Sequence, residues 1–192
     1  MKKILIGTHN TGKFKEISFL LKKNIKKISP KLLNIKSPKE TGKSFSANAK
    51  LKAKYFSKFT KLPVISDDSG LCIKALKGKP GIFSARYAKK CGSFNKAMKF
   101  ILKKMKNKKD RSAVFVCSLT YISNRENIVS VTGKIKGSIS YEIKGSQGFG
   151  YDPIFIPFLK SVTFGQMSKN KKMKMDHRYI AFKKLKKRIK IL

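Results

Sequence analysis

Two adjacent carboxylates are the residues of this sequence that most clearly indicate chemistry. Asp67 and Asp68 follow the apolar run 62–65 and precede a Ser-Gly pair at 69–70, a pattern that predicts a strand ending in a turn. Neighbouring carboxylates repel each other unless a cation or a shared proton lies between them. Oxygen ligands of this kind suit Mg²⁺, which usually binds together with substrate phosphates. The same residues are common at a solvated strand end, so the pair needs support from the rest of the chain.

The composition makes these acids conspicuous. The chain has 192 residues, with 47 Lys and Arg against 9 Asp and Glu, and a formal net charge of +38. The lysines are spread along almost the whole sequence, which favours a lysine-rich solvated surface over one dedicated nucleic-acid patch. We therefore expect no specific nucleic-acid partner, although the charge would support non-specific binding. The same field would attract anionic small molecules such as nucleotides.

Length and composition also limit the domain architecture and the cellular compartment that we expect. We expect a single domain over residues 1–192, built as two lobes, because the length suits one domain and 41% of the residues are hydrophobic. The three cysteines form no CxxC pair, which argues for a reducing compartment and against a disulfide framework. The first residues carry too short an apolar run for a signal peptide or a membrane span. The sequence thus predicts a cytoplasmic protein without a membrane partner.

The N-terminal segment predicts a strand, a polar loop and a helix. Residues 4–7 are apolar, and the helical spacing begins at Phe14. The loop between them consists of Thr8, His9, Asn10, Thr11, Gly12 and Lys13. A loop of this kind directs backbone N–H groups and the positive end of a helix towards an anion, and Lys13 adds a charge. The glycine spacing is not that of a Walker A loop, and an ordinary strand-to-helix turn fits this stretch equally well.

The middle of the chain alternates helices and strands. After a polar connection at 30–43, with room for a short strand at 32–35, Ser44 is expected to cap a helix that runs to about residue 59. Asn48 and Lys52 share one face of it, which would meet either a phosphate or solvent. Beyond a turn at 78–81, a third helix is expected at 94–105. Strands are then expected at 112–121, 127–135 and 137–143, with a hairpin-like connection at 123–126.

Two segments near the C-terminus are suited to recognising a base. The glycine-rich loop at 145–157 includes Phe149, Gly150, Tyr151 and Asp152, and an aromatic ring on such a loop would either stack on a base or fill the core. A basic segment at 163–175 then leads into a helix opened by Asp176, His177 and Arg178. The His-Arg pair would contact a purine edge or a phosphate, although such a pair is more often plain surface.

Taken together, the local patterns resemble one known family over nearly the whole chain. The matching pieces are THNTGKFKE at 8–16, SFSANAKLKA at 44–53, SDDSGL and PGIFSARYA within 66–88, RSAVFVCSL at 111–119, GFGYDPIF at 148–155 and QM…K…HR at 166–178. This pattern is similar to the inosine triphosphate pyrophosphatase family. The resemblance implies an α/β fold in which helices flank a long, twisted mixed sheet and two lobes surround a central cleft. It also implies a homodimer.

The activity implied by the resemblance is Mg²⁺-dependent hydrolysis of ITP, dITP and XTP to the nucleoside monophosphate and pyrophosphate. Such a house-cleaning enzyme keeps deaminated purines out of DNA and RNA. By position, Asp68 would be the general base and a metal ligand, and Asp67 would assist with the metal. The resemblance assigns the substrate to these residues: the loop 8–13 and Lys52 for the triphosphate, Ser69 as a further contact, Phe149 as the stacking ring, Gly150, Tyr151 and Asp152 for the pocket, and Lys172, His177 and Arg178 for the purine.

The chain departs from the family pattern mainly by losing acids. Ala47 stands where relatives usually carry a metal-site Glu, and Gln166 and Lys136 also replace acids. The acids that remain in the matching segments are Glu16, Asp67, Asp68, Asp152 and Asp176. Because these are kept in so basic a chain, we expect an active enzyme. The rival hypotheses are a nucleic-acid-binding protein on an inactive pyrophosphatase scaffold and a pyrophosphatase with a different base preference.

Overall fold

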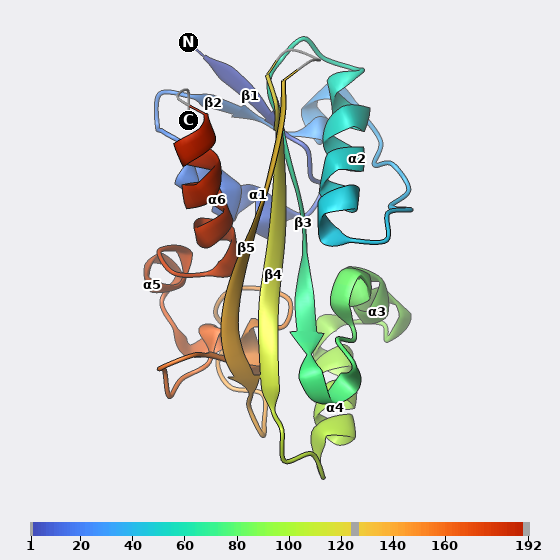
Figure 1. Cartoon of the computed structure of the whole chain (residues 1–192), viewed down its shortest axis with the longest axis vertical. Coiled ribbons are helices and arrows are strands. Elements are labelled where there is room, and N and C mark those ends of the chain that lie inside the picture. Colours follow the sequence, from blue (N-terminus) through green and yellow to red (C-terminus); the bar gives the residue numbers. More distant parts are fainter. Residues whose placement is uncertain (1, 124–126, 190–192) are drawn as a thin grey trace. The chain divides into compact units, whose positions relative to one another are not determined.

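The structure is a computed structural model that describes residues 2–123 and 127–189 (Figure 1). The connection expected at 123–126 therefore lies almost entirely outside the described residues. The helices and strands are β1 (Lys3–Ile6), α1 (Thr11–Leu20), β2 (Lys26–Ile28), α2 (Phe45–Ser57), β3 (Val64–Ile73), α3 (Ser84–Lys90), α4 (Phe94–Met105), β4 (Ser112–Ile122), β5 (Ile128–Ile139), β6 (Phe155–Pro157), α5 (Lys169–Met173) and α6 (His177–Arg188). Among the described residues, no helix is both long and apolar enough to span a membrane.

The strands form one mixed sheet of six in the order β2-β1-β3-β4-β5-β6. Strand β1 pairs in parallel with β2 and β3, whereas β5 and β6 pair antiparallel. With helices beside this sheet, the predicted α/β class is confirmed. The chain divides into two compact units: unit 1 comprises residues 1–68, 117–133 and 178–192, and unit 2 comprises residues 69–116 and 134–177. We describe each unit separately.

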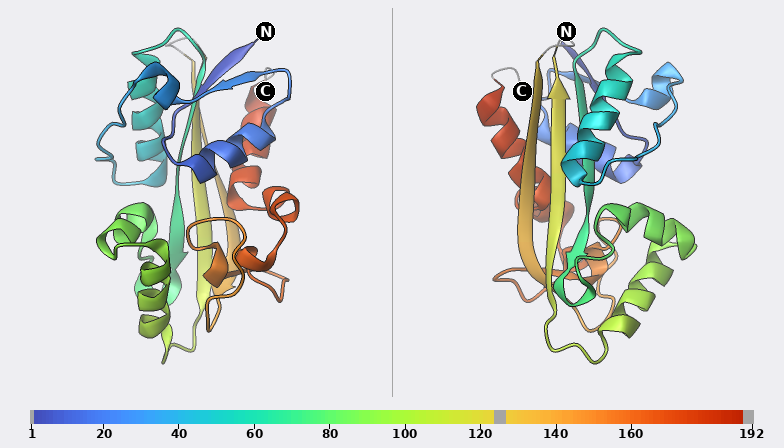
Figure 2. Two further views of the ribbon diagram at one scale, coloured as in Figure 1. Left: turned by 180° about the vertical axis from the view of Figure 1, so that it is seen from behind. Right: turned by 45° about the vertical axis from the view of Figure 1, so that its right-hand side comes forward.

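In unit 1, both faces of the sheet are covered by helices. Side chains of a strand alternate between its faces, so Ile4 and Ile6 pack on one side and Leu5 on the other. The first face meets α1 and α6, and the second meets α2 through residues such as Phe56. This arrangement can be followed in Figures 1 and 2, where α2 and α6 flank the strands from opposite sides. A strand that is covered on both faces typically consists of a continuous run of apolar residues, as residues 4–6 do.

Unit 2 has a separate core. Helix α4 buries Met98, Ile101 and Met105 against the β3 residues Leu71 and Ile73. The spacing of three and four residues along α4 agrees with the predicted amphipathic helix. Phe155 and Phe164, whose ring centroids lie 5.4 Å apart, complete this core. The glycine-rich loop and the basic segment after it are therefore anchored through their aromatic side chains.

The turn predicted at 69–70 is wrong. Strand β3 is ten residues long and continues through both aspartates to Ile73. Gly70 is required here for space, because a Cβ at this position would lie 2.3 Å from the carbonyl oxygen of Gly81 and 2.4 Å from Oγ of Ser84. A glycine inside a strand often marks such a close approach of another segment. The two aspartates thus lie within a strand.

Three other boundaries differ from the prediction. Residues 30–33 form a 3-10 helix that starts at Pro30, and Leu32 is 73% exposed, so no strand forms at 32–35. The separate strand expected at 137–143 is also wrong, because β5 continues to Ile139 and pairs with β6. Helix α1 already begins at Thr11, so Thr11, Gly12 and Lys13 form its first turn and not a loop. The short helix α3 was not predicted.

Candidate active site

The β1–α1 connection in unit 1 is a compact, capped turn. Asn10 is the N-cap of α1, and its Oδ1 accepts a hydrogen bond from the backbone N–H of Lys13 at 2.9 Å. The buried Thr8 accepts one from the backbone N–H of Asn10 at 3.2 Å. His9 is turned towards another segment, with Nδ1 2.6 Å from the Ser37 hydroxyl oxygen. The turn therefore leads directly into the positive end of a helix, which favours a bound anion.

Asp67 is held by basic side chains. Its carboxylate is fully buried and lies 3.2 Å from Nζ of Lys13 and 3.2 Å from a guanidinium nitrogen of Arg178. Arg178 is itself 1% exposed and also forms an ion pair with Glu16. Burial acts to raise the pKa of Asp67, but the charges of Lys13, Arg178 and Lys52 outweigh it and hold this pKa well below the ordinary value. Asp67 is therefore an ionised anchor between α1, β3 and α6.

Asp68 has a different environment. The side-chain amide of Asn48 donates a hydrogen bond to its Oδ2 at 3.0 Å, and the Oδ1 of Asn48 accepts one from the backbone N–H of Gly42 at 2.8 Å. Burial raises the pKa of Asp68 despite the opposing charges of Lys13 and Lys52. Two neighbouring carboxylates thus have pKa values shifted in opposite directions. Such a division is typical of sites where one acid is structural and the other exchanges protons.

Lys52 completes the cluster in unit 1. It is buried, and its Nζ lies 2.6 Å from a carboxylate oxygen of Glu40. Burial acts to lower the pKa of Lys52, but the charges of Asp67, Asp68 and Glu40 raise it above its ordinary value. The lysine is therefore a charged group at neutral pH. Asn48 and Lys52 lie on one face of α2, as predicted, although that face is buried and not solvated.

The described residues contain no group of three His, Cys, Asp or Glu side chains arranged to hold a metal ion. Asp67 is already surrounded by cations, so it fits a metal poorly. Asp68 is the better candidate, because its Oδ2 accepts a hydrogen bond from the neutral side-chain amide of Asn48. Mg²⁺ is commonly bound through one or two carboxylates together with phosphates and water. The residues present fit that arrangement, with Asp68 as the protein ligand.

Unit 2 brings together three of the residues expected to recognise a base. One oxygen of Asp152 accepts hydrogen bonds from the backbone N–H of Phe149 at 2.8 Å and from Nζ of Lys172 at 2.6 Å. The Lys172 ammonium also lies 4.9 Å from the centre of the half-buried Phe149 ring. Gly148 has a φ of +77°, and a Cβ there would lie 2.1 Å from the same Asp152 oxygen. Asp152 therefore organises the loop and fixes the lysine beside the ring.

The remaining predicted residues have mixed surroundings. The Tyr151 hydroxyl donates to the backbone oxygen of Ser84 at 2.9 Å, and burial raises its pKa, so this tyrosine is part of the core. His177 is buried and stacks on Phe115, with ring centroids 4.8 Å apart. Arg178, expected to act beside Lys172 and His177, belongs to unit 1, where it contacts Glu16 and Asp67. Ser69 is half-buried on β3.

The structure adds Glu40, which sequence reasoning did not name, and it gives partners to Glu16 and Asn48, which sequence reasoning named without assigning their contacts. Glu16 pairs with Arg178, Glu40 pairs with Lys52, and Asn48 binds Asp68. The scarcity of acids could have indicated that the two glutamates form ion pairs, because any acid in so basic a chain has many basic residues to pair with. Their particular partners could not be read from the sequence, because Glu16 and Arg178 are separated by 162 positions.

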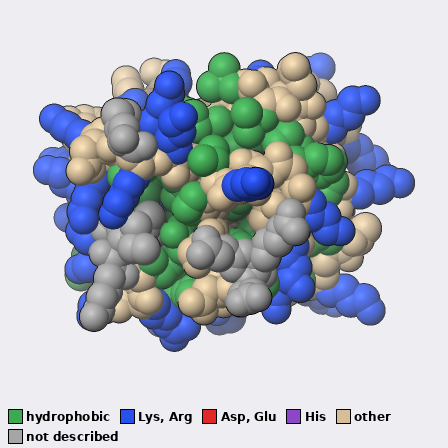
Figure 3. All heavy atoms as spheres, turned by 90° about the horizontal axis from the view of Figure 1, so that it is seen from above, with side chains coloured by type: hydrophobic (Ala, Val, Ile, Leu, Met, Phe, Trp, Pro, Cys, Tyr) green, Lys and Arg blue, Asp and Glu red, His purple; other side chains and the backbone are tan. Residues whose placement is uncertain are grey.

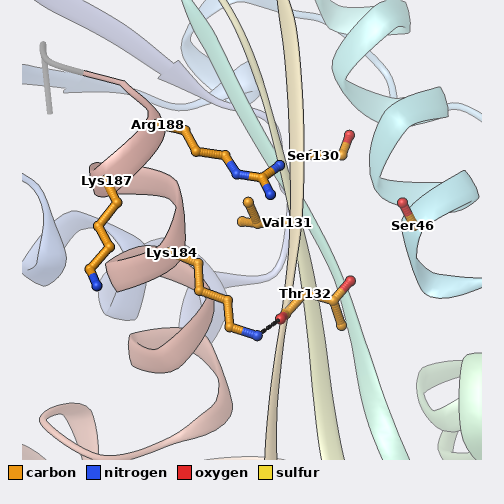
Figure 4. A pocket seen from close by; sticks show the side chains of 7 residues that line it. All are labelled: Ser46, Ser130, Val131, Thr132, Lys184, Lys187 and Arg188. Atoms are coloured by element: carbon orange, nitrogen blue, oxygen red, sulfur yellow. Dashed lines mark hydrogen bonds between the residues drawn. The ribbon is translucent and has the colours of Figure 1, made fainter.

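Basic side chains are distributed over the face drawn in Figure 3 and also line a hollow in unit 1. On the face drawn in Figure 3, Lys and Arg side chains are spread widely and are interrupted by apolar and neutral atoms. Unit 1 also has a basic hollow of about 480 Å³, lined by Ser46, Ser130, Val131, Thr132, Lys184, Lys187 and Arg188. In Figure 4, Lys184 reaches across it and donates to the backbone oxygen of Thr132 at 2.9 Å. None of the predicted site residues lines this hollow.

We predict that Asp67→Asn lowers the free energy of unfolding by about 3 kcal/mol at neutral pH, because breaking a buried ion pair leaves its cations uncompensated. The pKa of Asp67 is lower in the folded protein, so its contribution is present above the pKa of an unfolded aspartate. It is lost as pH falls through the lowered pKa. Denaturant unfolding of both proteins from about pH 2 to 7 should show a difference that narrows in acid.

The matched control is Asp110→Asn, which removes an exposed carboxylate 3.1 Å from Lys74. Exposed pairs contribute little to stability, so this change should leave the unfolding curve nearly unaltered at neutral pH. Equal losses for the two variants, or a difference independent of pH, would contradict the role assigned to Asp67.

Comparison with known proteins supports the fold, and the matches cover most of the chain. Residues 4–188 match the model of the Ham1 family. A protein of Dictyoglomus thermophilum named dITP/XTP pyrophosphatase is 43% identical over 95% of this chain and 92% of its own length. One of the same name from Caulobacter vibrioides is 40% identical over 96% of both chains. A Ham1 protein from Coxiella burnetii superposes with a TM-score of 0.89 at 33% identity over the full length of both chains. A Staphylococcus aureus Ham1 protein gives 0.87 at 35% identity over 98% of both.

A match of this extent by sequence and by structure leaves one conclusion: the chain belongs to the Ham1 family.

Proposed function

We propose that this protein hydrolyses non-standard purine nucleoside triphosphates, namely ITP, dITP and XTP, to the nucleoside monophosphate and pyrophosphate. The observation that carries the proposal is the buried Asp68, held by Asn48 in a unit that also gathers Lys13, Lys52 and the start of α1. Relatives at 36–43% identity are named dITP/XTP pyrophosphatase, which supports the reaction. The cytoplasmic location and the homodimer stay predictions.

The triphosphate is assigned to residues of unit 1. The first turn of α1 offers backbone N–H groups at its positive end, and Lys13 and Lys52 supply charge. Asp67 and Glu40 hold these two lysines, so the ammonium groups are oriented before the substrate arrives. Preorganised donors of this kind need no reorganisation when charge develops in the transition state. Phosphoryl chemistry depends mainly on such positioning and charge stabilisation.

Asp68 is assigned as the general base. Burial raises the pKa of its carboxyl group, which makes it a stronger base than an exposed aspartate. In the proposed reaction it takes a proton from the water that attacks the α-phosphorus. The bond from this phosphorus to the oxygen bridging the α and β phosphates breaks, so pyrophosphate leaves and the water oxygen becomes part of the nucleoside monophosphate. Mg²⁺, held by Asp68 and the substrate phosphates, would neutralise phosphate charge when bound. The hydrogen bond from Asn48 fixes the carboxylate for either task.

The base is assigned to residues of unit 2. Phe149 is half-buried and is assigned to stack on the base, and Lys172 lies beside it with its ammonium on Asp152. An ammonium group donates hydrogen bonds, so Lys172 is assigned as the donor to a carbonyl oxygen of the base. Inosine and xanthine carry an oxygen at position 6, whereas adenine carries an amino group that cannot accept such a bond. This difference favours 6-oxopurines.

The proposal is tested by pyrophosphate release from ITP, dITP, XTP, ATP and GTP, with and without Mg²⁺. We expect Mg²⁺-dependent cleavage of the first three, with kcat/KM at least about tenfold above that of ATP, because one lost hydrogen bond to a charged donor costs roughly 1.5–3 kcal/mol. No turnover of any nucleotide would contradict the proposal. A salt-dependent affinity for RNA or DNA would then point to the inactive-scaffold hypothesis.

Asp68→Asn should lower kcat for ITP by about 10²–10⁴-fold, because the amide cannot accept the proton of the attacking water. The fold should persist, since the amide is nearly isosteric with the carboxyl group. The measurement is steady-state kinetics together with thermal unfolding. Retention of most of the turnover in a folded variant would remove Asp68 as the base.

Ala47→Glu should lower the Mg²⁺ concentration needed for half-maximal activity. Ala47 is exposed in the first turn of α2 and directly precedes Asn48, which binds Asp68, so a carboxylate here would add an oxygen ligand near that acid. The control is Ala47→Gln, which has the same size without the charge. If Mg²⁺ titrations of both variants match that of the wild type, an acid at position 47 has no role in metal binding here.

A further inference from the structure

A second hollow lies within unit 2, in segments that the candidate active site does not use. Its volume is about 480 Å³, and it is lined by Ala75, Leu76, Lys77, Lys79, Pro80, Phe83, Tyr87, Ile101 and Lys104. We call it the α3–α4 pocket. The lining comes from α3, α4 and the segment 75–83 that connects β3 to α3. Its size is within the range of roughly 300–1,000 Å³ that is usual for small-molecule sites.

The walls of the α3–α4 pocket are apolar. Pro80 and Ile101 are buried, Leu76 and Tyr87 are half-buried, and the Phe83 ring is 53% exposed. The guanidinium of Arg86 lies over the Phe83 ring, 4.5 Å from its centre, so one face of the ring is covered by a cation. Apolar area in contact with water is unfavourable, and a ligand with an apolar body would remove it from solvent.

The rim of the pocket is cationic. Lys77, Lys79 and Lys104 line it and are all exposed. Within residues 2–123 and 127–189, none of these three lysines forms an ion pair; the nearby acid Asp110 pairs with Lys74. Like charges gathered at one opening repel each other, and an anion bound among them would relieve that repulsion. The pocket therefore combines an apolar interior with an unneutralised positive entrance.

We propose that the α3–α4 pocket binds a small amphipathic organic anion, with a single sulfonate, carboxylate or phosphate head on an aromatic or branched apolar body. The body would pack on Phe83, Leu76 and Ile101, and the head would lie among the rim lysines. A second copy of this chain covering the pocket is an alternative that the test below distinguishes. The inference is independent of the proposed activity.

The test uses a matched pair of fluorescent probes. The anion is 8-anilinonaphthalene-1-sulfonate, and the neutral analogue is N-phenyl-1-naphthylamine, which has the same rings without the sulfonate. We expect saturable 1:1 binding of the anion that weakens as salt is raised. We expect the neutral probe to bind at least about tenfold more weakly, because it lacks the charge that the rim attracts.

Variants locate the site. Phe83→Ala should weaken both probes by about tenfold, because the ring supplies apolar contact area. Lys77→Gln, Lys79→Gln and Lys104→Gln together should weaken only the anion, by about tenfold. The control exchanges the exposed Lys22, Lys23 and Lys58 for Gln, which removes the same net charge from unit 1 and should leave both affinities unchanged.

The proposal would be overturned by any of three results. The first is no saturable binding of the anion, and the second is equal weakening by the rim and control variants. The third is concentration-dependent self-association that Phe83→Ala abolishes, since a second copy would then cover the pocket. Thermal unfolding, measured in parallel, reports on the folded state of each variant and does not depend on the proposed activity.

Discussion

The buried carboxylate of Asp67 is the group on which unit 1 depends most. It lies in the interior of β3 and contacts Lys13 of α1 and Arg178 of α6, so one charge links two helices to the sheet. Removing a charged group from water is unfavourable, and it is tolerated here only because cations are placed around the carboxylate. The cations around Asp67 also make it a poorer candidate than Asp68 for binding a metal ion, and its lowered pKa makes it a weaker base.

The same principle governs the other acids of the chain. With only 9 acids among 192 residues, Glu16, Glu40 and Asp152 each hold a basic side chain at or near the candidate site. These contacts orient Arg178, Lys52 and Lys172 without neutralising the basic surface as a whole. An enzyme that binds a triphosphate benefits from both properties. The field attracts the substrate, and the local carboxylates keep the binding cations in fixed positions.

Much of the fold and part of the site could be predicted from the sequence. The strand at 4–6, the cap at Ser44, the amphipathic helix with Met98, Ile101 and Met105, and the helix opened by His177 all follow from local patterns. These features depend on residues a few positions apart, so periodicity and capping chemistry are sufficient. The mistaken turn at Ser69 and Gly70 shows the limit, because that glycine serves the approach of Gly81 and Ser84 and not a local bend.

The sequence by itself determined the family pattern, the apolar periodicities and the presence of two adjacent acids in a basic chain. Only the tertiary structure decided which of the two acids is held ionised among cations and which has a raised pKa. Asp67 meets Arg178 across 111 positions, and Asp68 meets Asn48 across 20, so the two pKa values move in opposite directions although the residues are chemically identical neighbours. Successive side chains of a strand point to opposite faces. Each face is covered by different helices, and the charges on those helices are fixed by long-range packing that no local pattern encodes.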